Sequence, residues 1–141
     1  MGASGWRHVT PYDPDLRAVL ARLRQQVFDE HDYYWPAAPD SDSGEPEWPA
    51  SMAELTPTPD GTHSILDIHR VIDAGAPDDF ATLRPITTEE ELDLFGTTVP
   101  TTADFERLTD HSLPRWSARA VVLHSPGGDP THIGVWGISG D

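Results

Sequence analysis

Apolar side chains at helical spacing predict a long helix over residues 14–28. Five of them recur every three or four residues and form one continuous stripe: Leu16, Val19, Leu20, Leu23 and Val27. Arginine and glutamine side chains occupy the opposite side of this segment. Asp13 is suited to cap the helix, and Pro14 is suited to the first helical position. Such a stripe must pack on other apolar elements, and we expect a sheet to cover it.

A two-residue period predicts four strands, at residues 6–10, 62–72, 117–124 and 131–139. Apolar residues fall on both faces of the second of these segments, which favours a central position in the sheet. The last two segments flank a Pro-Gly-Gly-Asp-Pro turn and therefore form a hairpin. Gly134 and Gly137 in its return strand let another backbone or a large ring come close.

Two short helices are predicted between these strands. Thr87 and Glu90 have the spacing of a capping box, and Gly96 is a suitable C-terminal stop. The expected apolar contacts of this helix are Leu92, Leu94 and Phe95. Thr101 caps a second helix within residues 100–108, whose inward-facing residues are Phe105 and Leu108. Together the elements predict an α+β fold, a mostly antiparallel sheet of about four strands with one long N-terminal helix and two short helices.

Residues 36–62 differ in composition from both flanks, because they hold six prolines, six acids and no arginine. This composition predicts a long acidic surface loop. Ser51 and Glu54 have capping-box spacing and predict a single helical turn at residues 51–55. We expect Trp48 to hold the loop against the body. Neither flank has enough apolar pattern to fold alone, so residues 1–141 are expected to form a single domain.

The charge of the chain restricts its partners. The net charge is −15, and all nine basic residues are arginine. A chain this negative repels nucleic acid phosphates, whereas it suits a basic partner or simply a solvated acidic surface. The absence of cysteine excludes disulfides and thiolate metal sites. The start has no signal-peptide pattern, and no apolar run approaches the roughly 20 residues that span a membrane, so we expect a cytoplasmic protein.

One carboxylate and two histidines share a face of the predicted strand 62–72: His63, Asp67 and His69. Asp67 and His69 are about 6.6 Å apart along an extended backbone. Three interpretations stay open. Asp67 orients His69 as a general base, the pair binds a metal ion, or the two groups form a structural hydrogen bond.

Other side chains are candidate binding groups. The aromatic candidates are Tyr33, Tyr34, Trp35 and Trp48. They serve either as a stacking surface for a partner or as a cluster that caps the end of the helix. The arginine candidates for a carboxylate or phosphate are Arg70, Arg84, Arg115 and Arg119, for which internal ion pairs are the alternative. His124 and His132 face each other across the hairpin if its pairing is symmetric about Gly128.

Several short blocks also carry a resemblance. They are Gly5-Trp6, Thr10-Pro11-Tyr12, Leu23-Arg24-Gln25-Gln26-Val27-Phe28, Gly61-Thr62-His63-Ser64-Ile65-Leu66-Asp67-Ile68 and Ser139-Gly140-Asp141. With these blocks the chain resembles a group of small actinobacterial proteins of unassigned function, over most of its length except the acidic loop. The resemblance implies a bacterial, intracellular protein and assigns no site residues.

Two classes of function follow from these observations. The first is a soluble acidic binding or accessory protein, an inhibitor- or immunity-like module that engages a basic protein partner through its aromatic residues and Arg70. The alternative is a small cytoplasmic enzyme of specialised metabolism that uses Asp67 and His69 in an α+β pocket. The main interpretation assigns no cofactor, no metal, no nucleic acid and no membrane partner, and it leaves the oligomeric state open.

Overall fold

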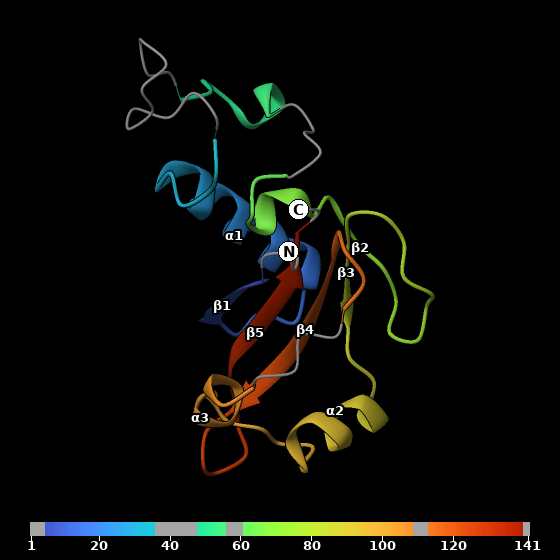
Figure 1. The fold of residues 1–141 in the computed structure, drawn as a ribbon. Helices are drawn as coiled ribbons and strands as arrows, with labels where there is room; N and C mark the ends of the chain where they lie inside the picture. The colour runs from blue at the N-terminus through green and yellow to red at the C-terminus, as the bar shows by residue number, and fades with distance from the viewer. Residues whose placement is uncertain (1–4, 36–47, 56–60, 109–112, 140–141) are drawn as a thin grey trace.

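The computed structural model describes residues 5–35, 48–55, 61–108 and 113–139, which form a mixed five-stranded sheet with helices on both faces. The strands are β1 (Gly5–Pro11), β2 (Arg70–Val71), β3 (Thr82–Pro85), β4 (Ser117–His124) and β5 (Pro130–Ile138). Their order across the sheet is β1-β5-β4-β3-β2 (Figure 1). The pairs β1–β5 and β5–β4 are antiparallel, whereas β4–β3 and β3–β2 are parallel.

The predicted α+β class is confirmed, but the details of the sheet are not. The sheet has five strands instead of about four, and two of its four strand pairs are parallel. The N-terminal strand and the C-terminal hairpin lie where the two-residue period placed them. The short strand β3 was not predicted. Its four residues are too few to establish a period, and two of them, Thr82 and Leu83, are buried on opposite faces.

The long helix is α1 (Leu16–Asp29), which begins later than predicted. Asp15 is the N-cap, because its side chain accepts hydrogen bonds from the amides of Arg17 and Ala18. Asp13 acts one step earlier and accepts from the amide of Asp15 at 2.8 Å. The predicted stripe is confirmed at its four buried positions: Val19, Leu20, Leu23 and Val27.

The helix stripe and one face of the sheet enclose the larger core. Twelve buried residues form it, all of them aliphatic. The strands contribute Leu83, Ala118, Ala120, Ile133 and Val135. These residues occupy alternate strand positions, as the pattern of the hairpin predicted. The α1 face of the sheet is therefore closed by apolar packing.

The opposite face carries two short helices, α2 (Thr88–Phe95) and α3 (Thr102–Glu106). Both predicted caps are confirmed, and each forms a complete capping box, with Thr87 and Glu90 in α2 and Thr101 and Asp104 in α3. The core on this face has five buried residues: Phe105, Leu108, Val121, Leu123 and Trp136. Leu92 was expected to contribute and does not, because it is 48% exposed.

The two glycines of β5 each lie beneath an aromatic ring, as predicted, and on opposite faces of the sheet. A Cβ atom at Gly137 would stand 2.2 Å from the ring of Trp6, on the α1 face. A Cβ atom at Gly134 would stand 2.9 Å from the ring of Phe105, on the face of α3. Both positions require glycine because the rings occupy the volume of any side chain.

Segment 62–72 is not the predicted central strand. It forms a turn, the 3-10 helix η2 (Ile65–Asp67), and the two-residue strand β2 at the edge of the sheet. The side chain of Asp67 organises the turn, since its Oδ1 atom accepts from the amide and the hydroxyl of Thr62 at 2.7 and 2.8 Å. Ile65, Leu66 and Ile68 are all buried against the core, so the apolar run fits a fully enclosed turn and not a strand.

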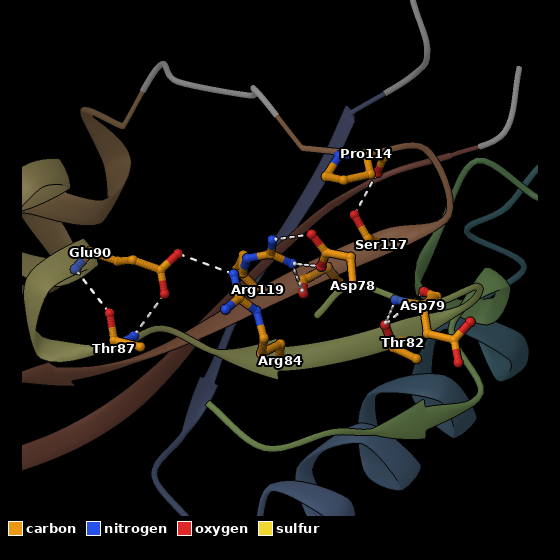
Figure 2. A network of polar contacts seen from close by, with 10 residues as sticks. Asp78, Asp79, Thr82, Arg84, Thr87, Glu90, Pro114, Ser117 and Arg119 are labelled. Carbon is orange, nitrogen blue, oxygen red and sulfur yellow. Dashed lines mark hydrogen bonds and ion pairs between the residues drawn. The ribbon is translucent and has the colours of Figure 1, made fainter. Parts of the chain in front are cut away.

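A polar network crosses the face opposite α1 (Figure 2). Arg119 of β4 is 5% exposed, and both its terminal nitrogens contact the carboxylate of Asp78, at 2.7 and 2.9 Å. Arg84 is its partner in register on β3 and contacts Glu90 of α2 at 3.2 Å. On β1, Arg7 donates to the carbonyls of Phe105 and Leu108 at the end of α3. These arginines therefore fasten the covering segments to the sheet.

Most of the predicted acidic loop, at residues 36–47 and 56–60, lies outside the described residues. Its described part includes η1 (Met52–Glu54), close to the predicted helical turn, although Ser51 makes no side-chain cap hydrogen bond. Trp48 is in contact with the body, as expected, because its ring stacks on His31 at a centroid distance of 4.1 Å. Within the described residues, no helix is both long and apolar enough to cross a bilayer.

Candidate functional site

A groove of about 540 Å³ lies at the end of the sheet where α1 begins. The sheet is uncovered there because α1 starts at Leu16 and runs back over the other end of the strands. The connection from β1 to α1 forms one wall, and α2 with the loop that follows it forms the other. The floor consists of small and β-branched residues of β4 and β5: Ala120, Val122 and Ile133.

The groove is acidic. Its lining includes the carboxylates of Asp13 and Glu91, and none of the fourteen described residues that line it is an arginine. Arg22 does not line the groove, although its guanidinium group lies 3.9 Å from the carboxylate of Asp13. The phenol of Tyr12 and the imidazole of His124 add two groups that can donate and accept hydrogen bonds. The polar groups lie at the rim, whereas the floor is apolar.

Glu91 and His124 both line this groove and interact electrostatically. Burial raises the pKa of the Glu91 carboxyl, and the charge of His124 partly opposes that shift. The Nδ1 atom of His124 lies 3.2 Å from the carbonyl oxygen of Pro100, which only accepts. Nδ1 therefore carries the proton in the neutral imidazole, and Nε2 is left with its lone pair. The backbone amide of His124 donates to the same carbonyl, which fixes the position of the residue.

This arrangement can act in two ways. An apolar floor with carboxylates at the rim fits a basic group on an aliphatic stem, such as an arginine or lysine side chain. A carboxyl group with a raised pKa beside a histidine of fixed tautomer can also exchange protons with a bound molecule. Both possibilities use residues that the sequence analysis did not select, apart from His124.

The hydrogen bonds seen for Asp67 join it to Thr62 and Ser139, and none is seen to His69, its predicted partner. Asp67 is 4% exposed, and both its oxygens are engaged, since Ser139 donates to Oδ2 at 3.0 Å in addition to the bonds from Thr62. His69 lies between η2 and β2 and is exposed. The two residues line one small cavity of about 60 Å³, but Asp67 serves there as a structural acceptor. Their shared strand face was inferred from a strand that does not exist.

The predicted aromatic candidates mostly contact other residues of the chain. Tyr33 lies against Phe28 at a centroid distance of 6.1 Å and meets Trp48 edge-on at 5.3 Å. Tyr34 stacks on His63 at 4.9 Å and remains 46% exposed. This is the cluster at the helix end that the sequence analysis offered as the alternative to a partner surface. Trp35 is half-exposed in the same segment.

Three of the four predicted arginine candidates form internal ion pairs. Arg84 and Arg119 pair with Glu90 and Asp78, and Arg70 pairs with Asp79. Arg70 nevertheless also lines a second hollow beside α1, which is described below. Arg115 lies near the start of β4, away from the groove.

The two hairpin histidines do not face each other. An irregularity in the ladder between Leu123 and His124 shifts the register, so that His132 pairs with Leu123 and His124 pairs with Pro130. The shift turns the two imidazoles toward different surroundings, and only His124 lines the groove. Among the described residues, no group of three or more metal-binding side chains is close enough to hold a metal ion.

The sequence does contain a signal for part of the groove, but the same residues also fit the start of a helix. Tyr12, Asp13 and Pro14 form a polar, turn-forming segment between a strand and a helix, where binding residues often lie. The pattern was explained there as a helix cap. Glu91 gave no signal, because it is one of three consecutive glutamates in a helix that begins with a cap.

Comparison with known proteins found no matching family model, no matching curated protein and no matching solved structure.

Proposed function

We propose that the protein is a binding protein that engages a basic partner, and that a basic side chain of the partner enters the acidic groove. The observation that carries this proposal is the lining of the groove, which combines Asp13 and Glu91 with an apolar floor and has no described arginine. The net charge of −15 attracts a basic partner over a longer range. The groove then supplies the local contact.

The chemistry of the groove favours a guanidinium or ammonium group on a flexible stem. The stem packs on Val122 and Ile133, and the charged head reaches the carboxylates at the rim. A carboxylate that is partly withdrawn from water interacts more strongly with a cation than a fully solvated one does. Glu91 is such a group, since burial raises its pKa. Binding of a cation would therefore favour its ionised form.

The test compares two probes of the same shape. Backbone amide NMR spectra are recorded while N-acetylarginine methylamide or its uncharged isostere N-acetylcitrulline methylamide is added to the full chain. For the arginine probe we expect saturable changes in the amide chemical shifts of Tyr12, Glu91 and His124. The affinity for the citrulline probe should be at least about tenfold lower, because a charged contact is lost.

The matched variants are Glu91→Gln and Glu89→Gln, which remove the same charge from the same helix. Glu89 is exposed and does not line the groove. Glu91→Gln should abolish the saturable shifts, and Glu89→Gln should leave them. Equal effects of the two variants, or shifts spread over the whole acidic surface, would reject the groove as the binding site.

The Glu91–His124 pair supports a second candidate function, a small enzyme with a general acid–base pair in the groove. The proposed chemistry is still general acid–base catalysis, but the residues are Glu91 and His124 of the groove instead of Asp67 and His69. The enzyme hypothesis predicts that the imidazole NMR signals of His124 shift when Glu91 is changed to Gln, because the two groups interact electrostatically. Imidazole signals that are the same in both proteins would count against the pair.

A further inference from the structure

A second hollow beside α1 has the opposite charge. It has a volume of about 400 Å³ and lies between the outer side of α1 and the edge strand β2. Its seven lining residues are Arg17, Leu20, Ala21, Arg24, His69, Arg70 and Val71. Three of the nine arginines of the chain thus meet in one hollow, and none of its lining residues is an acid. We call this hollow the basic pocket.

Helical geometry and one small side chain make this pocket. Arg17, Ala21 and Arg24 are spaced by four and three residues and therefore lie on one side of α1. Ala21 between them leaves the space open. Across the gap, β2 is the last strand of the sheet, so Arg70 and the preceding His69 are not covered by another strand. The pocket therefore opens at the sheet edge.

The positive charge in the pocket is incompletely balanced. Arg70 forms an ion pair with Asp79, and both groups are more than half exposed. Arg24 is acted on by Asp67, but hydrogen bonds from Thr62 and Ser139 already engage both oxygens of that carboxylate. The Nε atom of Arg24 is buried and has no hydrogen-bond partner among the described residues. Asp79 and Asp67 are therefore the carboxylates seen to interact with arginines of the pocket.

Partial burial lowers the pKa of two cationic groups in the pocket, Arg24 and His69. Burial lowers the pKa of Arg24, and Asp67 partly opposes the shift. Burial also lowers the pKa of His69, and the charge of Arg24 lowers it further, while Asp67 raises it. A bound anion would reverse these effects, because it stabilises each cation that it contacts.

We propose that the basic pocket binds the oxyanion group, a phosphate or a carboxylate, of a small ligand. Guanidinium groups bind such oxyanions through paired N–H donors, and Arg24 and Arg17 present them from one helix face. The cavity of about 60 Å³ adjoins the pocket, because Arg24 and His69 line both. Leu66 and Trp116 line that cavity and supply an apolar surface for a small substituent of the ligand.

The test uses inorganic phosphate and acetate as probes on the full chain. Each is titrated at constant ionic strength, with chloride as the balancing ion, and the amide signals of His69, Arg70 and Val71 are followed by NMR. We expect saturable shifts with at least one probe, and the stronger probe identifies the kind of oxyanion. We also expect the imidazole of His69 to titrate at higher pH in its presence.

Three single-charge variants complete the test. Arg24→Gln should weaken binding about tenfold or more, since it removes a charged hydrogen-bond donor. Arg17 is exposed in the first turn of α1, so Arg17→Gln should weaken binding severalfold without affecting folding. Arg107→Gln changes the net charge equally but lies on the other face of the sheet, and it should change the affinity less than about twofold.

Two results would overturn the proposal. One is the absence of saturable shifts at the pocket with both probes. The other is an equal loss of affinity in Arg107→Gln and Arg17→Gln, which would show that the anions respond to net charge alone. Neither result bears on the acidic groove, so the proposal on the basic pocket stands or fails separately.

Discussion

The two faces of the sheet are covered by different means. On one face, α1 presents four buried aliphatic residues to a core of twelve, and contact is apolar. On the other, two short helices and a loop cover a core of five residues, and arginines of the strands reach out to hold them. A long amphipathic helix can close a face by itself. Short segments bury too little apolar area and also need ion pairs and hydrogen bonds to hold them on the sheet.

The comparison also explains the placement of the arginines. Arg84, Arg119 and Arg7 project from β3, β4 and β1, on the face where the covering segments are short. Each contacts a different segment: α2, the residue Asp78 before β3, and the end of α3. The pair of Arg119 with Asp78, in which the arginine is buried, adds little net stability compared with apolar packing, but it is costly to break. These pairs therefore fix position more than they add stability.

The largest expected effect concerns the apolar face. Leu23→Ala should lower the free energy of unfolding by about 4 kcal/mol, because Leu23 is 2% exposed and sits at the centre of the α1 stripe. The matched change on the other face is Leu123→Ala, which we expect to lower it by about 2.5 kcal/mol since the short helices can shift to fill the space. Urea denaturation of both variants measures the difference. A larger effect of Leu123→Ala would reverse the comparison.

The next effect tests the ion pair between Arg119 and Asp78. Asp78→Asn removes the charge opposite Arg119, whose side chain is 6% exposed, and should lower the free energy of unfolding by about 3 kcal/mol. The adjacent change Asp79→Asn is the control, because it breaks the pair with Arg70 in solvent. Its effect on the urea midpoint should be much smaller. Similar midpoints for the two variants would show that the buried pair does not hold the loop.

A smaller effect separates the two glycines of β5. Gly137→Ala should destabilise the protein by about 2 kcal/mol, since the new Cβ would stand 2.2 Å from the ring of Trp6. Gly134→Ala should cost about 1 kcal/mol, because Phe105 stands 2.9 Å away and belongs to a short helix that can move. Thermal unfolding followed by circular dichroism gives the order. Equal melting temperatures would mean that Trp6 and Phe105 can shift equally well to make room for the new methyl group.

The smallest effect is a dependence on pH. Burial opposes ionisation of Glu90, but the hydrogen bonds from Thr87 and the charge of Arg84 outweigh it, so the pKa of Glu90 is lowered. A carboxyl group whose pKa is lower in the folded state stabilises the fold above its unfolded pKa, about 4.3. That contribution is lost as the pH falls through the folded-state pKa.

Glu90→Gln should therefore reduce the loss of stability between pH 7 and pH 3. Glutamine can still accept the hydrogen bond of the capping box, so the helix start is preserved while the charge is removed. Urea denaturation at the two pH values measures this, and Glu89→Gln is the exposed control. If the stability of Glu90→Gln depended on pH as that of the unchanged protein does, the Arg84–Glu90 ion pair would not contribute to stability.

Several features of the chain were determined by local sequence. The stripe of α1, the capping boxes at Thr87 and Thr101, and the hairpin with its two faces depend on interactions between residues close in the chain, and all are confirmed. The need for space at Gly134 and Gly137 was also evident. Which ring fills that space was not, since Trp6 and Phe105 come from distant segments.

Tertiary structure decided what local pattern could not. The apolar residues of segment 62–72 fit a strand by spacing, but a turn organised by Asp67 satisfies the backbone and buries them on every side. The parallel pairing of β3 joins segments that no local rule connects. The acidic groove and the basic pocket likewise each collect side chains from separate elements. Spacing along a chain fixes which face a residue occupies, whereas packing between elements fixes what that face meets.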